Sequence, residues 1–320
     1  MTLQQLKYIV ALDDERHFGR AAEVSIVSQP GLTIQLKKLE EEIGIQLFDR
    51  TKVPLKPTKL GEEIILKARK LLKDADQIRE HIIDSKNLLE GTIKLGVVIT
   101  LSPYLIPLII DEIKKTMPKV NFIVEENSTI ALMKSLENGS IDIALMATPT
   151  GNKQLKEFPI FNEQFVAYIN SSHQLLTEDF YTIENKDFSK LLLLKEEFCY
   201  NAQLLNICNI KESKTNIDQF NFDVTSIETL KNLVRADLGF AIIPELSTIH
   251  ENNKNLIKLF KNPKPVREIS LVVSESFYKT LILEKLKEII WNVIPESCKL
   301  LSNFKKIHWN DSPYFRKVTK

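Results

Sequence analysis

The chain has 320 residues, of which 43% are hydrophobic and 27% are charged, and its formal net charge is +1. This composition excludes a disordered chain, a collagen-like repeat and a highly charged binding protein, and the length predicts two or three folded units. No apolar run approaches the roughly 18 residues that span a bilayer, and acidic residues interrupt the N-terminal segment where a signal peptide would stay apolar. We therefore expect a cytoplasmic protein with no membrane partner.

Apolar residues at helical spacing predict two short helices between residues 3 and 25. A third helix is predicted from Ser28, whose hydroxyl can cap it, to Gly44, and Pro30 fits its first turn. Two helices joined by a short turn are typical of a helix-turn-helix, in which the N-terminal end of the second helix enters the major groove of DNA. Residues 47–57 contain two prolines and β-forming residues, which predict a short hairpin.

The side chains at the start of the third helix have the chemistry needed to read DNA. Gln29 offers a donor and an acceptor to a base edge, Thr33 can meet a phosphate or a thymine methyl group, and Lys37 can neutralise backbone charge. The hairpin would carry Lys52 and Lys56 along the phosphates. The alternative is an ordinary solvated helix face. The predicted DNA-contacting residues are Ser28, Gln29, Pro30, Thr33, Lys37, Arg50, Lys52 and Lys56.

A long helix is predicted to follow Thr58. Its apolar residues alternate spacings of four and three, as the a and d positions of a coiled coil do. This stripe consists of Ile64, Ala68, Leu71, Ala75, Ile78 and Ile82. The pattern predicts a dimer through this helix, and the alternative is that the stripe packs against the helix's own domain.

Beyond Gly91 strands alternate with helices, which predicts βαβ units on a parallel sheet. Two such sets predict an effector region of two α/β subdomains with a cleft between them. The predicted domains are a DNA-binding domain (1–58), a linker helix (59–89), an effector domain (90–300) and a C-terminal tail (301–320). The effector domain would divide into one subdomain of about 90–161 and 265–300 and a second of about 162–264.

The segment "HFGRAAEVSIVSQPGLTIQLKKLEEEIGIQLFDR" resembles the winged helix-turn-helix of LysR-type transcriptional regulators. It has the family's Phe, Ala-Ala, Ser-Gln-Pro, Leu, paired-acid, Gly and Leu-Phe-Arg landmarks. The resemblance extends to about residue 88 and then implies a two-subdomain effector domain, similar to periplasmic binding proteins, from residue 91 to about 300. It also implies promoter DNA and RNA polymerase as partners, a dimer through the linker helix, and commonly a tetramer on DNA.

The three cysteines, Cys199, Cys208 and Cys298, are too few for a disulfide framework in a chain of this length. Free cysteines are often buried as small hydrophobic residues, and the residues alone leave this interpretation open for Cys199 and Cys208. Their spacing is not that of a zinc-binding pair, and the five histidines are scattered. No metal, no cofactor and no role for Cys298 are predicted.

The stretch "EEFCYNAQLLNIC", together with "FDVTSIETLKNLVRADLGFAIIPEL" downstream, is similar to the peroxide-sensing OxyR subgroup of the LysR family. That subgroup has a reactive cysteine and a resolving cysteine nine positions later. The resemblance therefore implies that hydrogen peroxide oxidises Cys199, that Cys208 resolves the product as a disulfide, and that the protein is an activator in oxidative stress. It also implies that the pocket around the thiol includes Thr100, Thr129, Gln203 and Arg267.

The sequence departs from this subgroup next to Cys199. Phe198, Asn201 and Ala202 stand where a histidine and an Arg-Asp pair are usual. Because neighbouring cations lower a thiol's pKa, we expect weaker activation unless Arg267 or a helix N-terminus near Asn201 compensates. If residues 200–208 are helical, nine steps of ~1.5 Å separate the two cysteines by about 13 Å, and a disulfide would require that helix to unwind.

Two other functions fit the residues. A small anionic inducer could bind the cleft beside Thr100, Ser102 and the following helix N-terminus, a favourable place for an anion. A thiol peroxidase is the third possibility, but no second catalytic constellation accompanies the cysteines and an enzyme would not need the N-terminal 90 residues. We therefore predict no catalytic residues.

Overall fold

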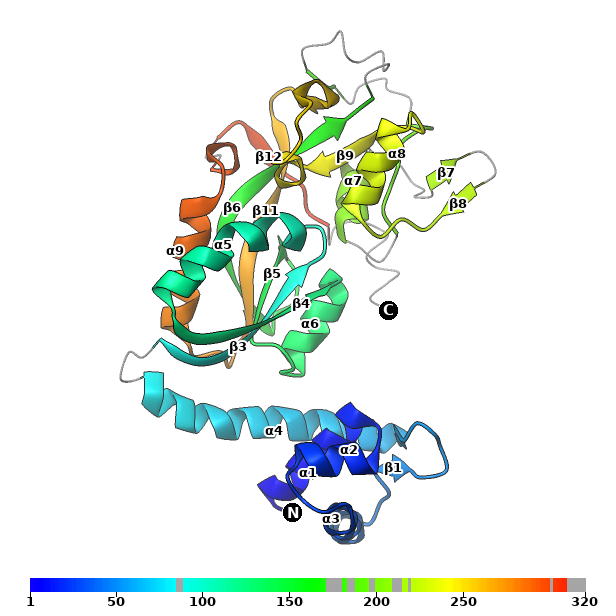
Figure 1. Cartoon of the computed structure of the whole chain (residues 1–320), viewed down its shortest axis with the longest axis vertical. Coiled ribbons are helices and arrows are strands. Elements are labelled where there is room, and N and C mark those ends of the chain that lie inside the picture. The colour runs from blue at the N-terminus through cyan, green and yellow to red at the C-terminus, as the bar shows by residue number, and fades with distance from the viewer. Residues whose placement is uncertain are drawn as a thin grey trace. The chain divides into compact units, whose positions relative to one another are not determined.

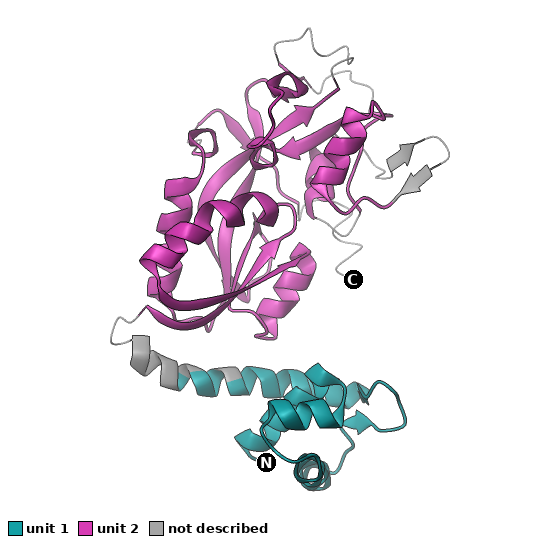
Figure 2. Ribbon diagram, in the orientation of Figure 1, with its two compact units in different colours: residues 1–88 teal, residues 89–320 magenta. Residues whose placement is uncertain are grey.

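The computed structural model describes residues 1–84, 89–170, 180–182, 188–195, 199–208, 215–217, 220–299 and 302–309. The chain forms two compact units, residues 1–88 and 89–320 (Figure 2). In the described part of the chain, no helix is long and apolar enough to cross a membrane.

The first unit is a helix-turn-helix with a short hairpin and a long helix. Its elements are α1 (Leu3–Glu15), α2 (Phe18–Val24), α3 (Gln29–Ile43), β1 (Phe48–Asp49), β2 (Lys56–Pro57) and α4 (Lys59–Asp84) (Figure 1). The Ser28 hydroxyl accepts a hydrogen bond from the Gly31 amide at 3.2 Å and caps α3, and Gly44 ends that helix at φ +73°. The predicted helices and hairpin are confirmed, and α3 begins and ends at residue types that favour those boundaries.

The stripe predicted on α4 is only partly free for a partner. Ala68 is buried in the core of the first unit and Ile64 packs against that core. Leu71 and Ile78 are exposed by 44% and 70%, whereas Ile82 lies outside the described side chains. The turns of α4 around Ala68 therefore stabilise their own domain, because the face bearing Ala68 turns toward α1, and of the stripe's described side chains only Leu71 and Ile78 are exposed.

Ile26, in the turn between α2 and α3, adopts a left-handed backbone conformation at φ +55° with its side chain 92% exposed. This conformation costs a branched residue roughly 1–2 kcal/mol, whereas asparagine visits it readily. We expect Ile26→Asn to raise the free energy of unfolding by about 1 kcal/mol. Urea denaturation followed by helical circular dichroism measures the change. Ile34→Asn, on an exposed helical residue of α3, is the matched control, and equal shifts in the two variants would contradict the prediction.

The second unit is a mixed sheet covered by helices. Its first half contains β3 (Glu90–Val98), α5 (Ser102–Thr116), β4 (Lys119–Asn127), α6 (Thr129–Glu137), β5 (Ile143–Thr148) and β6 (Leu155–Tyr168). Its second half contains α7 (Cys199–Cys208), β7 (Thr215–Ile217), β8 (Phe220–Phe222), α8 (Ile227–Arg235), β9 (Ala241–Pro244), η2 (Glu245–Thr248), η3 (Lys254–Leu256), β10 (Ile257–Leu259), β11 (Lys264–Ser274), α9 (Thr280–Val293), η4 (Glu296–Cys298) and β12 (Phe304–Lys306).

The predicted α/β architecture is confirmed, but the prediction of a parallel sheet is wrong, because the sheet is mixed. The main strand order is β10-β6-β11-β5-β3-β4, in which β3 is parallel to β4 and β5 while β11 is antiparallel to both β5 and β6. The long strands β6 and β11 run side by side through the unit (Figure 1). The end of β6 then pairs with β9 and β10. These two antiparallel strands carry the chain from one end of the unit to the other and back.

Residues 304–309, which the sequence assigned to a C-terminal tail outside the effector domain, are part of the second unit. Strand β12 pairs in parallel with the start of β11, and the Ile307 amide donates to the Val266 carbonyl oxygen at 2.8 Å. The Trp309 side chain is fully buried, and its Nε1 donates to the Ala147 carbonyl oxygen at 3.1 Å. The core of this unit therefore needs a segment that lies beyond the last long helix in sequence.

Candidate functional site

Cys199 and Cys208 are the first and last residues of α7, and both are free thiols. Their side chains are only 8% and 5% exposed. All residues between them are helical, so nine helical steps separate the two backbones by about 13 Å. A disulfide requires Cα atoms within roughly 4.4–6.8 Å. The two cysteines therefore cannot be linked while α7 is intact.

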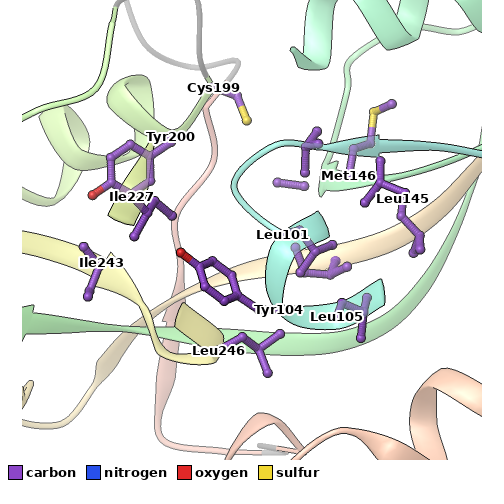
Figure 3. Close-up of a cluster of buried hydrophobic side chains, with 14 of the residues drawn as sticks. Leu101, Tyr104, Leu105, Leu145, Met146, Cys199, Tyr200, Ile227, Ile243 and Leu246 are labelled. Atoms are coloured by element: carbon purple, nitrogen blue, oxygen red, sulfur yellow. The ribbon is translucent and has the colours of Figure 1, made fainter. Parts of the chain in front are cut away.

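Thr129, the first residue of α6, donates a hydrogen bond from Oγ1 to Cys199 Sγ at 2.9 Å. Cys199 lies in a cluster of buried side chains that includes Tyr200 from the same helix and Met146 from β5 (Figure 3). The Tyr200 hydroxyl donates to the Ile242 carbonyl oxygen and thereby ties α7 to β9. The fold thus brings Thr129 to Cys199, as predicted from the resemblance, although 70 residues separate them.

A fully buried arginine near the Cys199 thiol links strands β11 and β6 to the residues that follow β3. Arg267 on β11 donates from Nη1 to Thr100 Oγ1 at 2.8 Å and from Nη2 to the Thr100 carbonyl oxygen at 3.1 Å. Its Nε and Nη2 also contact Glu163 Oε2 on β6, at 2.8 and 2.7 Å. Glu163 is itself fully buried and accepts the Leu246 amide at 2.9 Å. Arg267 and Thr100 therefore form one hydrogen-bonded group with Glu163.

Sequence reasoning missed Glu163. The available signal was an acidic residue inside the otherwise uncharged segment "FNEQFVAYIN", with a single arginine inside the later strand "VREISLVV". Since buried charges are almost always paired, opposite charges inside two strands indicate that the strands are neighbours.

The charges around Cys199 do not make its thiol acidic. Burial raises the pKa of the Cys199 thiol above its ordinary value, and the Thr129 hydrogen bond, the Arg267 charge and backbone amides at the start of α7 only oppose that rise. Burial likewise raises the pKa of Cys208 to about 12. The expected contribution of Arg267 is present, but burial outweighs it, and Glu163 offsets the arginine's charge. Both thiols are protonated at neutral pH in this conformation.

This electrostatic setting predicts how Cys199 reactivity depends on pH. Below a thiol's pKa the thiolate fraction rises tenfold with each pH unit, and only the thiolate reacts. Because the pKa of Cys199 is raised, we expect its alkylation rate in the reduced protein to keep rising beyond pH 8.5 without a plateau. Iodoacetamide labelling followed by mass spectrometry measures the rate, with an unstructured cysteine peptide as control. A plateau below pH 8.5 contradicts the prediction.

The remaining predicted pocket residues make their described hydrogen bonds elsewhere. The buried Ser102 hydroxyl, at the start of α5, donates to Glu126 Oε1 at 2.8 Å. Gln203 on α7 donates from Nε2 to the Ile307 carbonyl oxygen at 3.0 Å, and its Oε1 has no hydrogen-bond partner among the residues that the structure describes. Asn201 donates to the Leu194 carbonyl oxygen. Phe198 lies outside the described residues.

The predicted DNA-contacting residues divide into exposed and structural ones. Gln29 and Pro30 begin α3 and are exposed, as are Lys37, Lys52 and Lys56. Within the motif, Ser28 caps α3 and the Thr33 hydroxyl donates to the Gln29 carbonyl oxygen at 2.9 Å.

Arg50 differs from these residues because its Nη2 lies 2.7 Å from Oε2 of the buried Glu40. Glu40 also accepts the Leu47 amide at 2.8 Å, so the pair fixes the start of the hairpin. Residues 50–73 form a stretch in which basic residues outnumber acidic ones by eight to two. Arg69, from this stretch, is paired with Asp13 and Asp14 on α1. Part of the positive charge of that stretch is therefore neutralised by acidic residues of the same domain.

Comparison with known proteins agrees with these two units. Residues 3–62 match the family model for bacterial regulatory helix-turn-helix proteins of the lysR family, and residues 86–293 match the LysR substrate binding domain. The chain is 32% identical over 274 residues to the hydrogen peroxide-inducible genes activator of Haemophilus influenzae, an alignment that covers 85% of this chain and 90% of that protein.

Two solved structures are similar over nearly the whole chain. Full-length OxyR from Pseudomonas aeruginosa superimposes with a TM-score of 0.79 at 31% identity and covers 93% of this chain and 100% of that one. A Corynebacterium glutamicum OxyR with hydrogen peroxide bound has a TM-score of 0.62 at 25% identity, covering 95% and 98% of the two chains. The chain therefore belongs to the LysR family of DNA-binding transcriptional regulators, which are not enzymes, and is similar to the OxyR proteins within it.

Proposed function

We propose that the protein is a cytoplasmic transcriptional activator that senses hydrogen peroxide through Cys199 and Cys208. One observation carries this proposal: the two thiols stand at opposite ends of a single buried helix, and the one at its start accepts a hydrogen bond from Thr129. A disulfide between cysteines at the two ends of a helix requires that helix to unwind. The oxidation state of the two thiols would therefore decide whether the helix is present. The similarity to peroxide-inducible activators supports the identity of the oxidant.

The chemistry needs only the two thiols and one molecule of peroxide. The Cys199 thiolate attacks a peroxide oxygen, the O–O bond breaks, and the leaving hydroxide takes up a proton to become water, which leaves Cys199 as a sulfenic acid. The Cys208 thiolate then attacks the Cys199 sulfur, the S–O bond breaks, and a second water leaves as the disulfide forms. Two electrons pass from the thiols to the peroxide.

The disulfide would act on DNA by changing the effector domain. Since the distance between the two cysteine Cα atoms must fall from about 13 Å to less than about 7 Å, α7 must unwind and the side chains packed on it must rearrange. We propose that this repacking alters a dimer held through the exposed turns of α4, or a tetramer of such dimers, and so changes the spacing of the α3 helices on promoter DNA. Contact with RNA polymerase would follow from that change.

In this proposal Gln29 reads a base edge, with Thr33 near the backbone and Lys37, Lys52 and Lys56 on phosphates. The exposure of Gln29, Lys37, Lys52 and Lys56 supports their roles. The Glu40 pairing makes Arg50 a structural residue first. A small anionic inducer beside Ser102 is disfavoured, because the Glu126 carboxylate would repel it there.

One experiment tests the proposal. The reduced protein is treated with about one equivalent of hydrogen peroxide, its cysteine linkages are mapped by mass spectrometry, and the same sample is titrated with a DNA fragment selected from random sequences. We expect a Cys199–Cys208 disulfide together with a changed affinity or footprint. A protein that forms no such linkage, or forms it without any change in DNA binding, is not a peroxide switch of this kind.

A further inference from the structure

Helix α7 is held by a segment from the far end of the chain, residues 303–309, which we name the C-terminal segment. Gln203 Nε2 donates to the Ile307 carbonyl oxygen at 3.0 Å, and Asn206 Nδ2 donates to the His308 carbonyl oxygen at 2.7 Å. Both donors lie between Cys199 and Cys208. The bonds therefore join the part of the chain that must unwind to a segment about 100 residues away.

The C-terminal segment is anchored independently of α7. Its residues 304–306 form β12 on β11, Lys264 donates its amide to the Asn303 carbonyl oxygen at 3.0 Å, and the buried Trp309 reaches the Ala147 carbonyl oxygen on β5. The Lys306 ammonium also pairs with Glu268 on β11. The carbonyl oxygens that receive Gln203 and Asn206 are thus fixed to the central sheet.

Helix α7 has little stability of its own. It has ten residues, fewer than the roughly 12–15 at which isolated helices become even marginally stable in water. Asn201 Oδ1 and Gln203 Oε1 are buried without a hydrogen-bond partner in the described part of the chain, and such orphaned acceptors destabilise the state that buries them. Contacts with neighbouring segments must therefore keep α7 folded.

We propose that the C-terminal segment is a latch that keeps α7 helical in the reduced protein and thereby limits how fast Cys208 can reach Cys199. The disulfide must bring together the two ends of the stretch that carries Gln203 and Asn206, so its formation breaks both latch bonds. The latch slows disulfide formation, because oxidised Cys199 remains a sulfenic acid until α7 separates from the C-terminal segment. This inference rests on the proposed peroxide function for its biological meaning, but the latch itself exists in the reduced protein.

The test uses two variants that weaken the latch, one in α7 and one in the C-terminal segment. Asn206→Asp keeps the shape and helix propensity of the side chain but replaces the donor by an acceptor facing the His308 carbonyl oxygen. Trp309→Phe keeps a ring in the core but removes the bond that anchors the segment to Ala147. The matched control is Asn232→Asp, an exposed asparagine near the end of α8 whose described hydrogen bond is to Arg235 of its own helix.

The first readout needs no peroxide. In the full-length reduced protein, maleimide labelling of Cys208 is expected to be about fivefold faster in each latch variant, the factor for loss of one ordinary hydrogen bond, and unchanged in the control. Cys298, buried in η4 outside the latch, is the internal reference. Local opening accelerates Cys208 alone, whereas general unfolding accelerates Cys298 equally. Unchanged labelling, or equal acceleration at Cys208 and Cys298, overturns the latch.

The second readout is the rate of Cys199–Cys208 disulfide formation after peroxide, which is expected to rise by a similar factor in the latch variants. If Cys208 labelling accelerates but the wild-type protein forms no disulfide, the latch stands and the peroxide function is wrong. If the wild-type disulfide forms and neither labelling nor its rate responds to the variants, the function stands and the latch is wrong.

Discussion

Replacing Cys199 with serine is expected to abolish peroxide-induced disulfide formation and, with it, the change in DNA binding. A serine hydroxyl does not reduce peroxide, and Cys208, whose pKa burial raises to about 12, offers almost no thiolate in its place. Peptide mapping after peroxide treatment should therefore find both remaining thiols reduced. DNA titrations with and without peroxide should give the same curve.

Cys208→Ser separates the two chemical steps. With no thiol to resolve it, the sulfenic acid on Cys199 is expected to accumulate and to be trapped by dimedone, with no S–S bond and no DNA response. Cys298→Ser is the matched control, because it removes the third buried thiol, which lies 3.8 Å from Glu245, and should leave the linkage unchanged. A disulfide between Cys208 and Cys298 in the Cys199→Ser protein would contradict the assigned roles.

Replacing Arg267 with methionine is expected to destabilise the second unit by about 3–5 kcal/mol, the usual cost of removing one partner of a buried ion pair. The change leaves Glu163 without its charge partner and Thr100 without its donor. Burial already raises the pKa of the Glu163 carboxyl, and the arginine charge opposes that rise. Without Arg267 the carboxyl must either stay ionised and unpaired or take up a proton. Thermal or urea unfolding of the full-length protein measures the loss.

A double-mutant cycle isolates the pair. Adding Glu163→Gln to Arg267→Met removes the uncompensated charge but keeps an amide oxygen that can accept the Leu246 amide, so the double variant should be more stable than Arg267→Met alone. Lys114→Met is the control, since its ion pair with Asp111 is exposed and should change stability by less than about 1 kcal/mol. An Arg267→Met loss as small as that of Lys114→Met would show that the buried pair does not hold the strands together.

Local signals in the sequence were sufficient for the DNA-binding domain. Ser28, Pro30 and Gly44 set the limits of α3 through caps and backbone preferences that depend on neighbours within a few residues. The helical state of residues 199–208 entered the sequence analysis only as a condition, and the structure supplied it. The predictions for α3 succeeded because the interactions that decide them are short in range.

The apolar spacing on α4 shows what a local sequence pattern does not determine. The four-three pattern identifies an apolar stripe but does not say what covers it, and the structure places Ala68 against its own domain while Ile78 stays exposed. The sheet gives a second example. Alternating strands and helices predicted parallel pairing, but β6 and β11 pair antiparallel across about 100 residues of sequence, and no local pattern records that pairing.

The sequence by itself predicted the helix-turn-helix and the α/β class of the effector region, and only its resemblance to the OxyR proteins implied which two cysteines could act together. Only the tertiary structure decided that burial raises the pKa of Cys199, that Glu163 offsets Arg267, and that Gln203 bonds to the C-terminal segment. The physical reason is common to all three. Burial, charge pairing and hydrogen-bond partners depend on residues 100 or so positions apart, whose proximity is created only when the whole sheet assembles.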